Sequence, residues 1–548
     1  MIVAEAVGAA LTRLGAGTVF GVVGSGNFHV TNALIAGGAR FVAARHEGGA
    51  ATMADAYARV TGGVGVLSVH QGPGLTNALT GITEAAKSRT PLLVLAADVS
   101  GSAVRSNFRI DQAALAAAVG AVPERVHSPA TAPADVARAW RTASAERRTV
   151  LLSLPLDVQA AECTGPTALR EPPAPPAPVP PPQAITRLAE GLAGARRPVF
   201  LAGRGARGAG APLRALAGRA GALLATSAVA RGLFRGDPFD LDVSGGFASP
   251  VAAELIRGAD LLIGWGCSLN MWTLRHGTLV GDGTQVVQVD LEAEALGTHQ
   301  PVDLGLVGDV AETARATEAE LARRGHEPPG YRSPELAARL QREVRWRDVP
   351  YEDDSDGSRI DPRTLSIALD DLLPAERTVA VDSGNFMGYP AMYLKVPDAG
   401  GLVFTQAFQS IGLGLATAIG AAIARPDRLT VAALGDGGAL MGVAELETAV
   451  RLRLGLLVVV YDDEAYGAEV HHFGPEGHPL DTVTFPPAGI AEIGRGFGCA
   501  AVTVGRPEDL AAVARWLDGP RDRPMIVHAK VTARRAAWWL EEAFRGHA

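Results

Sequence analysis

The chain has 548 residues, of which 47% are hydrophobic and 20% charged, and its formal net charge is −8. At about 100 to 200 residues per domain, this length predicts three or four domains, and the abundance of alanine and glycine fits compact α/β layers. The net negative charge argues against a nucleic acid or an anionic membrane as a partner.

Nothing in the sequence predicts export or membrane insertion. The first residues, MIVAEAVGAALTRLG, contain Glu5 and no basic region, so they predict an amphipathic helix and not a signal peptide. No apolar run reaches the roughly 18 residues that span a bilayer. Cys163, Cys267 and Cys499 show no metal-binding or disulfide spacing. We therefore expect a soluble, cytoplasmic protein with no nucleic-acid or membrane partner.

Apolar runs alternate with helical segments in three parts of the chain, 1–170, 184–325 and 363–548. This alternation predicts three α/β domains, each built on a doubly wound, mostly parallel sheet. The predicted strands are 18–23, 41–44, 64–69, 92–97, 150–154, 198–202, 222–226, 261–265, 285–289, 379–382, 429–434 and 456–461. A proline run at 171–183 is expected to form an extended linker without helix, and a polar connector at 326–362 precedes the third domain.

A glycine-rich loop follows the first predicted strand. Its residues Gly24-Ser25-Gly26-Asn27 look like the start of a dinucleotide fingerprint, but the third glycine would fall at His29. We therefore do not expect NAD to bind there. From the residues alone, Ser25 is expected to cap a helix at 27–34.

Two polar residues follow the next strands of the first domain. Glu47 comes after the strand at 41–44, so it should lie at the carboxyl end of the sheet and point into a ligand crevice. An ordinary surface charge is the alternative, because glutamate is rarely buried without a partner. His70 follows the strand at 64–69, and its pKa near neutrality suits proton transfer. A purely structural hydrogen bond would explain His70 equally well.

The stretch 429–467 contains the most informative pattern of the sequence. A strand is followed by Gly435-Asp436-Gly437-Gly438, a helical segment and a second strand that ends on Asp462 and Asp463. The two strands of such a unit are parallel neighbours, so Asp436 and Asp463 should lie at one sheet edge. Two carboxylates there suit Mg²⁺ with phosphate oxygens, and the glycines and helix start suit a diphosphate. A turn capped by Asp436 is the alternative.

This pattern resembles the cofactor motif of thiamine-diphosphate-dependent enzymes of the acetolactate synthase, benzoylformate decarboxylase and pyruvate decarboxylase family. The resemblance covers nearly the whole chain and implies a pyrimidine-binding, a central and a diphosphate-binding domain, in that order. It implies that Asp436 and Asp463 bind the metal through their side chains and Ala465 through its carbonyl. The family more often has Asn-Asn at Asp462-Asp463, and a second charge beside a diphosphate weakens anion binding unless the metal offsets it.

Other cofactor contacts follow only from this resemblance. The family's Arg-His-Glu-Gly run matches at Glu47, and there the glutamate touches the aminopyrimidine ring. A glutamic acid that shares its proton with this ring favours the imino tautomer, whose nitrogen takes the C2 proton of the cofactor. Ile411 matches the bulky residue that bends the cofactor, although a core isoleucine is the alternative. The remaining implied contacts are Gly384, Asn385, Gly435, Gly437, Gly438 and Tyr466.

The resemblance also implies substrate-facing residues. Benzoylformate decarboxylase has a serine like Ser25 that holds the substrate carboxylate, and a histidine like His70 that relays a proton. Gln112 falls where acetolactate synthases have a substrate-facing side chain. His471 and His472 follow the metal loop, and at most one of two adjacent residues can face the substrate. With Glu47, the implied catalytic residues are thus Ser25, His70, Gln112 and His471, whereas roles for His276 and His472 stay open.

The resemblance implies an acetolactate-synthase-like carboligase or lyase that acts on a 2-oxo acid through an enamine, with thiamine diphosphate and Mg²⁺ as cofactors. His70 favours the alternative, a decarboxylase like benzoylformate decarboxylase that forms no new carbon–carbon bond. A non-catalytic homologue that binds a phosphate ligand is the alternative of another class. Some relatives carry FAD in the central domain, but no clear FAD motif stands out here. In the family, Glu47 and Asp436 come from different subunits, which implies a homodimer or homotetramer.

Overall fold

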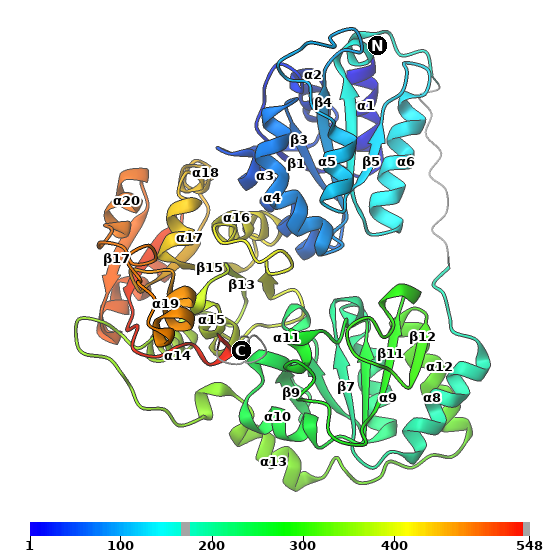
Figure 1. The fold of residues 1–548 in the computed structure, drawn as a ribbon, viewed down its shortest axis with the longest axis vertical. Helices are drawn as coiled ribbons and strands as arrows, with labels where there is room; N and C mark the ends of the chain where they lie inside the picture. The colour runs from blue at the N-terminus through cyan, green and yellow to red at the C-terminus, as the bar shows by residue number, and fades with distance from the viewer. Residues whose placement is uncertain (166–175, 541–548) are drawn as a thin grey trace.

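The protein contains three α/β domains, each with one six-stranded, fully parallel sheet (Figure 1). The computed structural model describes residues 1–165 and 176–540. Figure 1 shows the first domain at the top, the central domain at the lower right and the third domain at the left. The predicted fold class, three doubly wound parallel sheets, is therefore confirmed.

The first domain has the strand order β2-β1-β3-β4-β6-β5. Its strands are β1 (Thr18–Gly21), β2 (Arg40–Ala43), β3 (Gly65–Val69), β4 (Leu92–Asp98), β5 (Val122–Arg125) and β6 (Thr149–Pro155). Its helices are α1 (Val3–Arg13), α2 (Phe28–Ala36), α3 (Glu47–Thr61), α4 (Pro73–Lys87), α5 (Gln112–Ala118), α6 (Ala132–Ala145) and α7 (Leu156–Ala160). Separate apolar clusters on the two faces of the sheet hold the helices in place.

The central domain has the strand order β12-β11-β10-β7-β8-β9. Its strands are β7 (Pro198–Ala202), β8 (Leu223–Thr226), β9 (Asp240–Val243), β10 (Leu261–Trp265), β11 (Gln285–Asp290) and β12 (Leu304–Val307). Its helices are α8 (Pro182–Gly194), α9 (Gly210–Ala220), α10 (Pro250–Arg257), α11 (Met271–Leu274) and α12 (Val310–Arg323), and the short 3₁₀ helix η1 (Arg204–Ala206) follows β7.

The third domain has the strand order β14-β13-β15-β16-β18-β17. Its strands are β13 (Arg377–Val381), β14 (Leu402–Phe404), β15 (Leu429–Gly435), β16 (Leu456–Asp462), β17 (Ala500–Val504) and β18 (Met525–Lys530). Its helices are α14 (Pro362–Leu372), α15 (Gly388–Tyr393), α16 (Gly414–Ala424), α17 (Asp436–Met441), α18 (Glu445–Arg451), α19 (Gly467–Phe473), α20 (Ile490–Phe497) and α21 (Ala511–Leu517).

The two predicted connectors contain more helix than their composition suggested. Residues 166–175, which include the predicted end of the first domain and the start of the proline run, lie outside the described residues. The run ends inside a helix, because α8 begins at Pro182. A proline at the first helical position has no N–H to lose, so the expectation of a linker without helix was wrong at this end. The polar connector contains α13 (Pro334–Glu343), which starts from the Ser333 cap.

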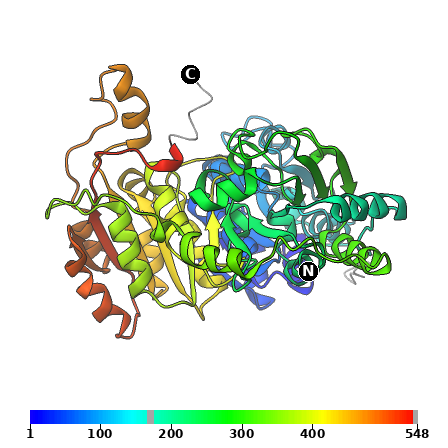
Figure 2. The same cartoon turned by 90° about the horizontal axis from the view of Figure 1, so that it is seen from below.

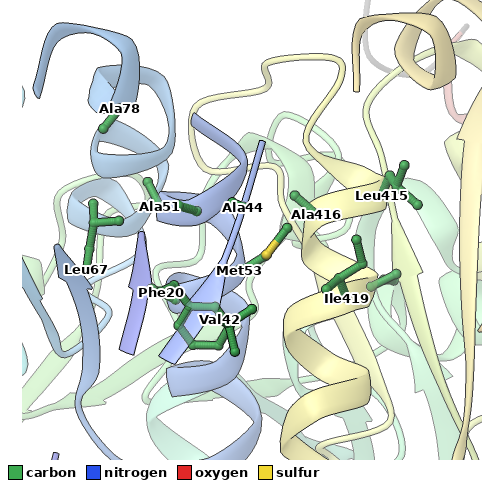
Figure 3. Packing of buried hydrophobic residues seen from close by; sticks show 14 of the residues in the cluster. Phe20, Val42, Ala44, Ala51, Met53, Leu67, Ala78, Leu415, Ala416 and Ile419 are labelled. Atoms are coloured by element: carbon green, nitrogen blue, oxygen red, sulfur yellow. The ribbon is translucent and has the colours of Figure 1, made fainter. Parts of the chain in front are cut away.

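The first and third domains pack together through helices α3 and α16. Met53 of α3 points toward Ala416 and lies near Ile419 of α16, inside one apolar cluster that joins the two domains (Figure 3). Gly420 is required for this close approach, because a Cβ there would lie 2.3 Å from the Met53 carbonyl oxygen. In the view from below, the third domain lies beside the other two (Figure 2).

Polar contacts strengthen the same junction. The buried Glu445 carboxylate at the start of α18 accepts hydrogen bonds from the backbone nitrogens of Arg45, at 3.1 Å, and His46, at 3.0 Å. These contacts fix the segment just before Glu47 against the third domain. Among the described residues, none of the helices combines the length and apolar character that crossing a bilayer requires.

Candidate functional site

The carboxyl edge of the third sheet brings together the two acidic residues that the sequence pattern singled out. Strands β15 and β16 are parallel neighbours, with Gly435 opposite Tyr461, which confirms the predicted strand–helix–strand pairing. Asp436 is the first residue of α17, and Asp463 directly follows β16. A turn at 442–444 divides the helical segment between the strands into α17 and α18.

These two acids have strongly raised pKa values. Burial raises the pKa of Asp436 to about 7, and the charges of Asp463 and Asp462 add to this effect. Burial also raises the pKa of Asp463 to about 6, although a hydrogen bond with Asn385 lowers it. Two carboxylates that lie close together and are shielded from water repel each other. A divalent cation bound between them would reduce this repulsion.

The side chains at this edge do not form a complete metal cage by themselves. Over the described ranges, no group of three or more His, Cys, Asp or Glu side chains is arranged to hold a metal ion. Two carboxylates and a backbone carbonyl such as that of Ala465 would leave coordination positions for phosphate oxygens. Mg²⁺ is commonly bound in this way, so the donor set fits a metal that bridges protein and diphosphate.

The negative charge of the neighbouring Asp462 is offset by two side chains that contact it. Its Oδ2 lies 2.6 Å from His528 Nε2 and accepts a hydrogen bond from Lys530 Nζ at 2.7 Å. Burial acts to raise the pKa of Asp462, but the hydrogen bonds from His528 and Lys530 hold it below its usual value. The charge of Asp462 is therefore offset within the protein by His528 and Lys530, two β18 residues that sequence reasoning missed, whereas the charge of Asp463 has no such offset among the causes that shift its pKa.

Close packing explains several glycines of the predicted diphosphate loop. A Cβ on Gly437 would lie 2.6 Å from the Tyr466 ring, and a Cβ on Gly438 would lie 2.4 Å from Asp382 Oδ2. Gly384, in the preceding loop, has φ 134°, a conformation that favours glycine. The loops at 384–385, 435–438 and 466 thus meet at one edge, as expected of residues that would share one ligand.

Asp382 organises the turn that carries Ile411. Its buried carboxylate accepts hydrogen bonds from Gly412 N at 3.0 Å and Leu413 N at 3.3 Å. Burial raises the pKa of Asp382 to about 6 in spite of these bonds. The half-buried Ile411 is therefore held at the end of a fixed turn and is not a fully enclosed core residue. Sequence reasoning missed Asp382, whose signal was a carboxylate directly after a strand.

The carboxyl edge of the first sheet holds Glu47 and His70. Glu47 starts α3 and accepts a hydrogen bond from Asn77 Nδ2 at 3.1 Å. His70 Nδ1 accepts a hydrogen bond from Gly26 N at 3.1 Å, and burial lowers the pKa of His70 although the charge of Glu47 opposes this. Gly74 lies between the two, because its Cβ would be 3.1 Å from His70 Cβ and 3.5 Å from Glu47 Oε1.

The other two predicted site residues of this domain, Ser25 and Gln112, differ in their exposure. Ser25 is exposed and lies two positions before Asn27, the residue at the N-cap of α2, so its expected capping role was wrong. Gln112 is only 4% exposed; its Nε2 donates to Ala97 O at 2.7 Å, and its Oε1 accepts from Ser153 Oγ at 2.9 Å. These contacts engage the Gln112 amide inside its own domain and do not support a substrate-facing position.

Helix α19 follows the proposed metal loop directly. Gly467 at its start is tightly enclosed, because a Cβ there would lie 2.2 Å from Asp463 Oδ2. Within the described part of the chain, the buried Nε2 of His471 has no hydrogen-bond partner, and burial lowers the pKa of this histidine. The adjacent His472 packs against the Phe473 ring, with centroids 4.6 Å apart. His471 is therefore the member of the pair with an unused polar atom.

Comparison with known protein families gives three matches in chain order. Residues 1–116 match the N-terminal TPP-binding domain of thiamine pyrophosphate enzymes. Residues 185–317 match the central domain of these enzymes, and residues 382–529 match their C-terminal TPP-binding domain.

Several curated proteins are similar along nearly their full length. A probable 2-ketoarginine decarboxylase of Pseudomonas aeruginosa is 32% identical over 529 residues, covering 93% of this chain and 91% of the relative. The catabolic acetolactate synthase of Raoultella terrigena is 29% identical over 554 residues, covering 96% of each chain. A sulfoacetaldehyde acetyltransferase of Rhodobacter capsulatus is 29% identical over 501 residues, covering 86% of this chain and 83% of the relative.

Proposed function

The chain belongs to the thiamine pyrophosphate enzyme family, and from this premise we propose that it decarboxylates a 2-oxo acid and releases an aldehyde. Membership makes it a thiamine-diphosphate-dependent carboligase or decarboxylase. The choice between these two reactions depends on His70, which lies beside Glu47 at the edge of the first sheet. A decarboxylase must protonate its product, and a histidine there offers a group that can move the proton.

The residues at both edges fit the cofactor. Asp436, Asp463 and the Ala465 carbonyl would hold Mg²⁺, and burial raises the pKa values of the two acids, so a bound cation would stabilise their charged forms. The loops containing Gly384, Asn385, Gly435, Gly437, Gly438 and Tyr466 would surround the diphosphate. When bound, thiamine diphosphate supplies the electron sink for loss of CO₂. Glu47 would share a proton with its pyrimidine ring, and Ile411 would support its bent shape.

The hydrogen bonding of His70 suggests how it acts. Because Nδ1 accepts the Gly26 N–H, the neutral ring carries its proton on Nε2. The lowered pKa keeps this neutral form dominant at pH 7. The Nε2–H can then donate a hydrogen bond to the substrate. Proton transfer to the product would use the protonated imidazolium form of His70, which returns to the neutral ring and is protonated again from water. The sequence left a structural hydrogen bond and a catalytic role as alternatives for His70. In this tautomer, Nδ1 can have the structural role while Nε2 has the catalytic one.

A product analysis separates the proposed reaction from carboligation. Purified protein with thiamine diphosphate and Mg²⁺ would be given pyruvate, benzoylformate or 2-ketoarginine, the last because of the Pseudomonas relative. We expect CO₂ and aldehyde in equal amounts from at least one of them. A 2-hydroxy-2-acyl product such as acetolactate would instead support carboligation, the second candidate, which the similarity to acetolactate synthases favours. A His70→Ala variant should lose aldehyde formation by at least tenfold if His70 moves the proton.

We further propose that the active enzyme is a homodimer or homotetramer in which Glu47 of one subunit faces the metal site of another. The hydrogen bond of Glu47 to Asn77 stays within the first domain, so its carboxylate has a second oxygen for a cofactor. Co-expression of Glu47→Gln and Asp436→Asn subunits tests this arrangement. At a thiamine diphosphate concentration that leaves Asp436→Asn unsaturated, mixed dimers would contain one intact site and should regain part of the wild-type activity. Activity no higher than that of either variant alone, or an active monomer in ultracentrifugation, would contradict it.

A further inference from the structure

Glu464 lies between Asp463 and Ala465, the two proposed metal-binding residues of the loop that follows β16. Its backbone has φ 59°, which is in the left-handed region. A residue with a Cβ adopts this conformation at a cost in free energy, and glycine, asparagine and aspartate are the residues that usually occur there. Because glutamate is not one of these residues, other contacts must stabilise the conformation of the loop.

Two cations bind the opposite oxygens of the Glu464 carboxylate. Lys530 Nζ donates to Glu464 Oε1 at 3.0 Å and also donates to Asp462 at 2.7 Å. Arg359 Nη2 lies 2.7 Å from Glu464 Oε2. The Glu464 side chain is 22% exposed, and those of Lys530 and Arg359 are 20% and 31% exposed. Water therefore screens these pairs only in part, and the two pairs together can hold the side chain in one position.

Both cations belong to segments that are fixed independently of the loop. Lys530 is the last residue of β18, which pairs with β16. Arg359 precedes Ile360, whose N donates to Lys530 O at 2.8 Å and which forms a parallel bridge with Val531. Arg359 Nη1 also donates to Val531 O at 3.1 Å. The end of the connector thus runs beside the end of β18, and the carboxylate lies between two segments of defined position.

Backbone hydrogen bonds hold the loop on either side of Ala465. Glu464 O accepts from Phe485 N at 2.8 Å, and Tyr466 N donates to Val483 O at 2.9 Å. Ala465 lies between these bonded residues, so the direction of its carbonyl depends on the conformation that Glu464 keeps. The side-chain pairs and the backbone bonds therefore act on the same short segment.

We propose, on the premise that the metal binds at this loop as proposed above, that Glu464 is a positioning residue. Its pairs with Arg359 and Lys530 offset the cost of the left-handed conformation, so that Asp463 and the Ala465 carbonyl are arranged before the metal binds. A loop that has this conformation only part of the time binds its ligand more weakly, in proportion to that fraction.

Two matched substitutions separate this role from a general contribution to stability. Glu464→Gly and Glu464→Ala both remove the carboxylate and its two ion pairs. Alanine keeps a Cβ and disfavours the left-handed conformation, whereas glycine adopts it readily. The two variants have the same charge, so a difference between them reports the backbone conformation and not the lost charge.

Equilibrium dialysis of thiamine diphosphate at increasing Mg²⁺ concentrations tests the proposal. The measured quantity is the Mg²⁺ concentration at which half of the protein has bound the cofactor. We expect this concentration to rise about tenfold in Glu464→Ala and less than about threefold in Glu464→Gly, because only the alanine variant leaves the required conformation. Arg359→Met removes one of the two pairs and should raise it about threefold.

A double variant tests whether Arg359 acts through Glu464. In the Glu464→Gly background, Arg359→Met should change the half-saturating Mg²⁺ concentration by less than about twofold, because the partner of the arginine is gone. Arg453→Gln, which removes an exposed pair with Asp522, is the control and should behave like wild type. The melting temperature of each metal-free variant is measured as well. Pairs that only stabilise the fold would lower this temperature and leave the Mg²⁺ dependence unchanged.

The outcomes distinguish this role from the metal site itself. Equal half-saturating Mg²⁺ concentrations in Glu464→Gly and Glu464→Ala would overturn the proposal. If Glu464→Ala does not fold, the effect of Arg359→Met in the wild-type and Glu464→Gly backgrounds decides the question. Wild-type cofactor binding that does not depend on Mg²⁺ would overturn the proposed metal site and the role of Glu464 together. A Mg²⁺-dependent wild type with unshifted variants would overturn the role of Glu464 alone.

Discussion

The first and third domains have the same strand order, yet the residues at their carboxyl edges have opposite electrostatic character. In the first domain, Glu47 lies at the edge beside His70, whose pKa is lowered, and Asp98 at the end of β4 is paired with Arg125. In the third domain, Asp382, Asp436 and Asp463 all have raised pKa values. One topology thus positions both edges, and we propose that the side chains that follow the strands make one edge suited to proton transfer and the other to cation binding. The following predictions test this division.

The largest expected effect is the loss of catalysis on removing the first-domain acid. Glu47→Gln keeps the shape and the hydrogen bond to Asn77 but cannot exchange a proton with the cofactor. We expect kcat to fall by about 10² to 10³, the usual range for an acid–base group, with the cofactor Kd changed less than about threefold. Steady-state kinetics and cofactor titration measure the two quantities. Glu254→Gln, which replaces an exposed acid of the central domain, is the control. Equal losses of cofactor affinity and kcat in Glu47→Gln would contradict the assignment of proton transfer to the first-domain edge and cofactor binding to the third-domain edge.

The reverse pattern is expected at the third-domain edge. Asp436→Asn removes one of the two proposed metal-binding carboxylates, and we expect the Kd for thiamine diphosphate in the presence of Mg²⁺ to rise by about 10 to 100-fold. At saturating cofactor, kcat should recover most of its wild-type value. A variant with wild-type affinity and no activity would show that Asp436 acts on the reaction itself, contrary to our assignment.

A tenfold effect is expected from shortening the side chain that Asp382 positions. Ile411→Ala removes the bulk that would support the bent cofactor, while the turn bonds to Asp382 remain. We expect kcat to fall about tenfold, or 1.4 kcal/mol in activation free energy, with little change in affinity. Ile411→Leu, which preserves volume, should retain most activity. Similar losses in both variants would mean that the site tolerates no change at all and that bulk is not the cause.

A smaller effect is expected from the support of the metal loop. Lys530→Met removes the cation that, with His528, offsets the Asp462 carboxylate. The uncompensated charge beside the diphosphate should raise the cofactor Kd about three- to tenfold. Addition of salt should narrow the difference from wild type, because salt screens the partly exposed pair. A Kd that matches wild type at low salt would show that His528 alone neutralises Asp462.

The smallest expected effect is on the stability of the metal-free protein. The folded-state pKa of Asp436, about 7, lies above its ordinary value of 3.8, so protonation favours the folded state. This contribution is complete below about pH 4 and is lost as the pH rises through about 7. In EDTA, wild type should therefore lose a few degrees more of melting temperature between pH 5 and pH 8 than Asp436→Asn. Parallel melting curves for the two proteins would refute the raised pKa.

The sequence predicted the elements whose signal is local. Strands β7 and β10 have the predicted bounds, because each is a short, continuous apolar run. Strand β5 was missed, since its residues Val122–Arg125 include a proline and two charges. Strand β18 was also missed, and its apolar run is interrupted by His528 and Lys530. His528 and Lys530 are also the residues that contact Asp462. The polar residues that kept the strand from being predicted are therefore the ones that β18 contributes to the site.

The candidate site was predictable where its residues are close in sequence. Asp436 and Asp463 belong to one strand–helix–strand unit, so their shared edge followed from topology. The role of Asp382 depends on Gly412, 30 residues later, and that of Glu445 on Arg45, 400 residues earlier. No local pattern encodes such contacts. The position of Gln112 was taken from the family alone, and its buried amide forms hydrogen bonds within its own domain that do not support a substrate-facing role.

The most direct test is the metal dependence of cofactor binding. Calorimetric titration of the metal-free protein with thiamine diphosphate should be performed once with excess Mg²⁺ and once with EDTA. If the third-domain carboxylates hold the diphosphate through a cation, affinity should be at least about 100-fold weaker in EDTA, because two acids and a diphosphate then repel each other. Equal affinity under both conditions would contradict the account.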